Sequence, residues 1–63
     1  MTVGKNIILK YAKGDITETR LLQVHRETPT YLKGWDVLRG GWRTFSIDKI
    51  RAMKAFGRFN LNR

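Results

Sequence analysis

Arg39, Arg43 and Lys49 are the side chains of this sequence best suited to binding an anion. A guanidinium group is planar and donates two parallel hydrogen bonds to phosphate oxygens, and Arg39 and Arg43 are close enough along the chain to reach one phosphate together. Lys49 can add a point charge but not a bidentate contact. The alternative is that these cations are solvated or pair with Asp36 and Asp48. The residue types favour an anion-binding site.

Tyr31 and Trp35 are candidates for stacking on the bases of a nucleic acid. Both fall on one face of an expected strand, with Lys33 between them. Aromatic rings interleaved with cations are typical of surfaces that bind single-stranded nucleic acid. Large aromatic side chains in a domain of this size are also often core residues, so both interpretations stay open.

The other polar residues predict neither a catalytic group nor a metal site. His25 is the only histidine and has no second metal ligand at a recognisable spacing. The five acids form no pair that can be placed across a cleft. Gly40-Gly41 lacks the lysine and hydroxyl of a phosphate-binding loop. We therefore expect a protein that is not an enzyme and uses no cofactor.

Size and charge narrow the class of protein. The 63 residues suffice for one small domain with a compact core. Thirteen Lys and Arg against five Asp and Glu give a formal net charge of +8, which attracts polyanions and acidic surfaces without specifying a sequence. There is no cysteine, so no disulfide supports the core. The apolar run Ile7 to Leu9 is too short for a signal peptide or a membrane span, so we expect a complete, cytoplasmic protein without a membrane partner.

Alternating apolar and polar residues predict four strands before residue 48. Their expected ranges are 7–11, 16–25, 31–38 and 42–47. The core is predicted to contain Leu32, Phe45, Ile47 and Ile50.

Local signals modify these strands. Arg39-Gly40-Gly41 indicates a tight hairpin turn, because glycine takes a positive φ without penalty. Gly34 lacks a Cβ, which permits either a kink or a close approach by another backbone. Leu21 and Leu22 interrupt the alternation of the second strand, as at a bend or bulge.

The segment after Ser46 has two interpretations. Helix propensity favours a helix capped by Ser46 and ended by Gly57. The alternative is a helical turn at 48–50 followed by a last strand at 51–56, because four strands are few for closing a barrel. We expect a single domain over 1–63, with a core of about 6–56 and a frayed end at 57–63.

The stretch from Tyr31 to Ile50 resembles the WYL domain, a bacterial module named for a Trp-Tyr-Leu triplet. In that family the triplet is usually followed by a hydrophobic strand, a Leu-Arg-Gly turn and an Arg-Thr-Phe-x-Leu-Asp-Arg-Ile pattern. The corresponding segments here are Thr30-Tyr31-Leu32, Leu38-Arg39-Gly40 and Arg43-Thr44-Phe45-Ser46-Ile47-Asp48-Lys49-Ile50. Thr30 replaces the tryptophan, and Lys49 replaces the last arginine. A weaker similarity to the family's first hairpin involves Lys10-Tyr11, Gly14-Asp15 and Thr19-Arg20.

The resemblance implies a mainly β fold: a five-stranded, Sm-like small β-barrel with one short helical turn before the last strand. It therefore favours the turn and strand after Ser46. It also implies ligand sensing and transcription regulation, since WYL domains commonly follow DNA-binding helix-turn-helix modules and bind nucleic acid or nucleotide-like ligands through a basic patch. This chain has no helix-turn-helix segment, so we expect an isolated bacterial or phage-encoded sensor. Its expected contacts with nucleic acid or an oligonucleotide are Arg39, Arg43, Lys49, Tyr31 and Trp35.

The alternative function is a protein-interaction module. Positive charge would then steer the chain toward an acidic surface of a host or regulatory protein. Edge strands of a small barrel also pair readily with those of another copy, so a homo-oligomer is a further expectation.

Overall fold

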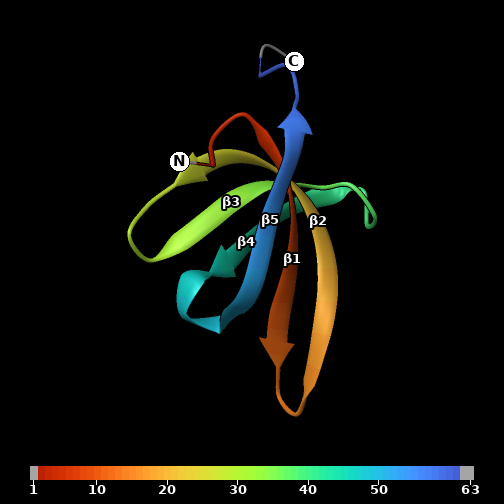
Figure 1. Ribbon diagram of the computed structural model, residues 1–63, viewed down its shortest axis with the longest axis vertical. Helices are drawn as coiled ribbons and strands as arrows, with labels where there is room; N and C mark the ends of the chain where they lie inside the picture. The colour runs from red at the N-terminus through yellow and green to blue at the C-terminus, as the bar shows by residue number, and fades with distance from the viewer. Residues whose placement is uncertain (1, 62–63) are drawn as a thin grey trace.

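The structure, a computed structural model, describes residues 2–61, which form one antiparallel sheet of five strands and one 3-10 turn. Hydrogen bonds order the strands β4-β3-β2-β1-β5, and the β1–β2 hairpin extends beyond the other strands (Figure 1). The elements are, in chain order, β1 (Lys5–Lys13), β2 (Ile16–Glu27), β3 (Tyr31–Asp36), β4 (Gly41–Ser46), η1 (Ile47–Lys49) and β5 (Ile50–Arg58).

The segment after Ser46 is a short turn followed by a strand, which confirms the structure that the resemblance implies. η1 ends at Lys49, and β5 then pairs with β1. Hydrogen bonds to β1 outweigh the helix propensity of the Ala, Met, Lys and Arg residues in this segment. β5 runs to Arg58, past the predicted end of the strand at Phe56.

Gly4 connects both ends of the described chain to the sheet. Its N–H donates to the carbonyl of Val24 (2.9 Å), and its own carbonyl accepts from the N–H of Phe59 (3.1 Å). Backbone pairing therefore continues just beyond β5. The last part of the predicted frayed end, 62–63, lies outside the described residues.

The sheet is curled but not closed, so the predicted barrel is corrected to an open sheet. β4 and β5 are its edges, and no ladder joins them within residues 2–61. The ring of Tyr11 on β1 packs edge-on against Phe45 on β4, with 4.9 Å between centroids, so the curl brings non-adjacent strands together. Closure fails because β5 stays paired with β1 and a groove separates it from β3 and η1; the groove is lined in part by Leu32, Ile47, Ile50 and Met53.

The concave side of the sheet, which we call the inner face, carries the core. Its buried apolar side chains are Ile7, Leu9, Leu22, Val24, Leu32 and Phe45. Leu32 and Phe45 are thus confirmed as core residues. Ile47 and Ile50 are only partly buried, and they pack against the edge of this cluster.

The predicted irregularity at Leu21 and Leu22 is wrong, because both residues pair regularly with β1. The apolar alternation is hidden in the sequence because a charged residue, Arg20, occupies the inner-face position before Leu22 and is buried there, with 7% of its surface exposed. The irregularity of β2 lies instead at His25, which is an extra residue in the pairing with β3.

Gly34 and Gly40 have the roles that the sequence predicts for them. A Cβ on Gly34 would lie 1.9 Å from the carbonyl oxygen of Gln23, so the backbone of β2 occupies the space of a side chain. Gly40 has a φ of 66° in the β3–β4 turn, and its N–H donates to the carbonyl of Asp36 (2.8 Å). Both glycines are therefore required by the backbone geometry.

Candidate functional site

Four cationic side chains line a hollow of about 450 Å³ beside the β1–β2 hairpin and η1. We call this hollow the basic pocket. Its lining contains no carboxylate and consists of Tyr11, Ala12, Lys13, Gly14, Arg20, Lys49 and Arg51.

Strand pairing positions the cations from three separate elements. Lys13 ends β1, and Lys49 ends η1. Arg51 is an extra residue in the pairing of β5 with β1, and such bulges redirect side chains out of the regular alternation. The Arg51 guanidinium is held locally, since its Nη1 donates to the carbonyl of Asp48 (2.7 Å).

Tyr11 gives the pocket a fixed aromatic wall. Its ring contacts Phe45, and its hydroxyl oxygen accepts a hydrogen bond from the N–H of Ser46 (3.4 Å). The side chain therefore bridges β1 and the end of β4 across the inner face.

Arg20 is the buried cation of the pocket. Its Nη1 donates to Oδ2 of Asp36 (3.2 Å), its Nη2 donates to Oε1 of Glu18, and its guanidinium carbon lies 5.8 Å from the centre of the Phe45 ring. Its buried Nε has no hydrogen-bond partner. Arg20 is thus largely neutralised by two carboxylates.

The electrostatics of Glu18 connect Arg39 with this pocket. The hydrogen bond from Arg20 lowers the pKa of Glu18 below its usual value, against a smaller opposing effect of desolvation. The charges of Lys13 and Arg39 lower that pKa further.

The remaining charge of the pocket suits anion binding. Lys13, Lys49 and Arg51 form no ion pair with a carboxylate among the described residues, whereas Arg20 forms two. Cations gathered in a partly enclosed hollow raise the local concentration of phosphate or carboxylate groups. None of the residues that line the pocket is a Ser, Thr, Cys, His, Asp or Glu.

The three predicted cations lie at different places around the inner face. Lys49 lines the basic pocket. Arg39 is exposed in the β3–β4 turn, where its backbone N–H donates to Oδ1 of Asp36 (3.1 Å). Arg43 is exposed on β4 opposite Gly34, and this register places it on the inner face.

The two predicted stacking residues lie on the opposite side, the outer face. Tyr31 and Trp35 alternate with the buried residues of β3 and are themselves half-buried. Trp35 contacts Trp42 (5.5 Å between centroids), and Trp42 contacts His25 (4.8 Å). The structure therefore does not bring the predicted aromatic residues together with the basic pocket.

Sequence reasoning missed four lining residues of the pocket: Tyr11, Lys13, Arg20 and Arg51. The available signal was the weak similarity of the first hairpin to the family pattern, which includes Tyr11 and Arg20. Lys13 was hidden in a segment predicted as a turn. Arg51 could not be assigned before the choice between helix and strand, because only the bulge of β5 places it at the pocket.

Residues 2–61 hold no group of three or more His, Cys, Asp or Glu side chains arranged to bind a metal ion. None of the helical segments in this range is long and apolar enough to cross a membrane.

Comparisons with known proteins identify the family. Neither the curated proteins nor the solved structures yield a match. The model of the WYL domain matches residues 4–55. The matched range contains every residue of the basic pocket. Because it covers most of the 63 residues, the chain belongs to the WYL domain family, a family of regulatory, ligand-sensing modules.

Proposed function

We propose that this WYL domain senses an anionic ligand, a nucleic acid strand or an oligonucleotide, through the basic pocket. The observation that carries the proposal is the convergence of Lys13, Lys49 and Arg51 on one hollow without a carboxylate in its lining. Backbone phosphates supply the sequence-independent part of nucleic-acid affinity, and lysine and arginine are their usual partners.

Arg39 and Arg43 extend the proposed contact beyond the pocket. Both are exposed, and guanidinium groups are well suited to contacts with backbone phosphates. Tyr11 is the aromatic side chain nearest to these charges, so it replaces Tyr31 and Trp35 as the first candidate for stacking. Tyr31 and Trp35 would contact only a strand that passes around to the outer face.

The direct test is the salt dependence of binding to a labelled single-stranded oligonucleotide, measured by fluorescence anisotropy. Each phosphate contact to a single strand contributes about 0.7 to the slope of log affinity against log salt, so Lys13→Ala/Lys49→Ala should reduce that slope by about 1.4. The matched control is Lys10→Ala/Lys54→Ala, which removes the same charge from exposed positions outside the pocket. Equal losses in the two double variants would mean that net charge, and not the pocket, determines binding.

A second binding titration tests whether Arg39 and Arg43 contact the oligonucleotide. Arg39→Ala/Arg43→Ala should weaken the oligonucleotide at low salt while leaving a mononucleotide, which fits within the pocket, almost unaffected. Unchanged binding of both ligands would remove Arg39 and Arg43 from the site.

A further inference from the structure

β5 is an edge strand that is exposed along nearly its whole length. Only Ile50 is partly buried, and every following residue of the strand is exposed. Two large apolar side chains of this strand are about half exposed, Met53 at 51% and Phe56 at 53%. One side of β5 pairs with β1, and the other side has no strand beside it among the described residues.

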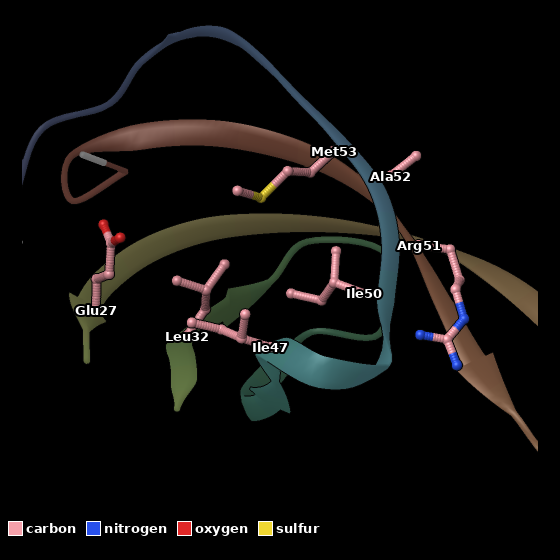
Figure 2. A pocket seen from close by; sticks show the side chains of 7 residues that line it. All are labelled: Glu27, Leu32, Ile47, Ile50, Arg51, Ala52 and Met53. Carbon is pink, nitrogen blue, oxygen red and sulfur yellow. The ribbon is translucent and has the colours of Figure 1, made fainter. Parts of the chain in front are cut away.

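A groove of about 210 Å³ runs along this open side. Figure 2 shows Leu32, Ile47, Ile50 and Met53 pointing into it, while Arg51 points away. The groove lies where a further strand would complete the curl of the sheet. An added strand could therefore pair with the backbone of β5 and place every second side chain in an apolar environment.

The charge around this edge selects the occupant. β5 carries Arg51, Lys54 and Arg58 and no acid, and the one carboxylate in the lining of the groove is that of Glu27 at the end of β2. The opposite edge, β4, carries Arg43 and no acid. Pairing between two copies of the chain would therefore bring cations together, whereas an acidic strand would be attracted.

We propose that the β5 edge and its groove bind an acidic, extended peptide segment of another protein, which adds as a strand beside β5. Acidic side chains of the segment face Lys54 on the outer face, and the alternate apolar side chains enter the groove beside Met53 on the other face. A nucleic acid lacks the amide backbone and the apolar side chains that this surface would satisfy. The site is separate from the basic pocket, and only Arg51 lines both hollows.

The test is an NMR titration with a capped peptide of alternating Glu and Val that matches β5 in length, nine residues. We expect slower amide exchange along β5 and shifted signals of Leu32 and Ile47. The matched probes are two N-methylated peptides, one modified at every valine and one at every glutamate. Because alternate amides point to opposite edges of a strand, one of the two should lose at least about tenfold in affinity and the other should bind as the parent does. Equal binding of all three peptides would overturn strand addition.

Variants locate the site and keep it distinct from the anion site. Lys54→Glu and Met53→Ser should each weaken the binding of the parent peptide, and the charge reversal should lower its affinity by about tenfold. The control Leu38→Ser alters an exposed leucine far from β5 in the sequence and should leave the affinity unchanged. Lys13→Ala/Lys49→Ala should bind the peptide normally, and Lys54→Glu should still bind the oligonucleotide. A loss of peptide binding in Lys13→Ala/Lys49→Ala would contradict the proposal. Slow amide exchange along β5 in a dimer without peptide would also contradict it, because β5 would then pair with a second copy of the chain.

Discussion

Arg20 is a charged residue in a position that strand alternation would otherwise give to an aliphatic side chain. It precedes Leu22 and Val24 on the inner face of β2, and its partner Asp36 is fully buried. Burying two charges costs several kcal/mol of desolvation per ion, which an ion pair offsets only with good geometry and further hydrogen bonds. Asp36 has such a bond, since it also accepts from the backbone N–H of Arg39.

The first prediction concerns this ion pair. Asp36→Ala should lower the free energy of unfolding by about 3 kcal/mol or more, because Arg20 then keeps only Glu18 as its partner. Urea denaturation measures the loss, and Asp15→Ala, which removes an exposed carboxylate, is the control. If Asp36→Ala does not fold, Arg20→Met/Asp36→Leu should recover most of the stability. A double variant less stable than Asp36→Ala would contradict this account.

The second prediction concerns Glu27, whose carboxylate accepts from the backbone N–H and the hydroxyl of Thr2 (2.8 and 2.7 Å). The side-chain hydrogen bond from Thr2 is the largest cause of a lowered pKa of Glu27. Because the pKa of Glu27 is lower in the folded state, its carboxylate stabilises the fold above the pKa of the unfolded state. This contribution to the free energy of unfolding is lost as the pH falls through the pKa of the folded state.

Glu27→Gln should therefore lower Tm at about pH 7, by at most about 4–8 °C for an exposed group worth no more than about 1 kcal/mol. At about pH 3 the variant and the parent should differ much less, because the parent carboxyl is then increasingly protonated. Thermal unfolding followed by circular dichroism measures both differences. A difference that does not change between these two pH values would show that the charge of Glu27 is irrelevant.

Of the side chains that line the basic pocket, the sequence predicts only Lys49 as a site residue. Lys49 was assigned from its chemistry and family position and lies in the basic pocket, but Tyr11, Lys13 and Arg51 reach that pocket only through the pairing of β1 with β5. A bulge cannot be read from alternation alone, since one inserted residue reverses the face of all that follow.

At the scale of the elements, four strands and the β3–β4 hairpin follow from alternation and turn residues. The fifth strand does not, because its residues favour a helix and only pairing with β1 decides the outcome. Closure of the sheet also cannot be predicted from local sequence patterns, because it depends on whether the two edge strands pair with each other. The bend at β2 was placed at Leu21 and Leu22, whereas the structure has it at His25.

The third prediction tests the close approach of β2 and β3. Gly34→Ala should destabilise the domain by about 3 kcal/mol or more, because its methyl group would lie 1.9 Å from a backbone oxygen that cannot rotate away. Gly41→Ala is the matched control, since no atom lies within 4 Å of the Cβ position there and its φ is not positive. Similar denaturation midpoints for the two variants would refute the packing argument.

At the scale of the whole molecule, a formal charge of +8 is spread over a body of 37 × 24 × 19 Å. At about 10 mM salt the screening length is about 30 Å, so cations on one copy repel those on another across distances comparable to the molecule. The open edges β4 and β5 would otherwise favour pairing between copies.

The fourth prediction is that the protein sediments as a monomer at about 10 mM salt and self-associates increasingly toward about 1 M, where the screening length is about 3 Å. Sedimentation velocity over this range is the measurement. Lys54→Ala should shift self-association to lower salt. Lys13→Ala should shift it less, because Lys13 lies on β1 and not on either edge strand. A dimer that forms at low salt and dissociates as salt rises would indicate attraction between the copies instead of repulsion.

The two hydrogen bonds of Gly4 have a consequence for protein architecture. They bring the start of β1 and the residue after β5 to the same backbone group, so the chain enters and leaves the sheet at nearly one point. A domain with adjacent entry and exit can be inserted into a surface loop of another protein, or circularly permuted at the exposed Gly40 of the β3–β4 turn, with little strain on the domain. This small sheet is thus suited to transfer as one unit into other proteins.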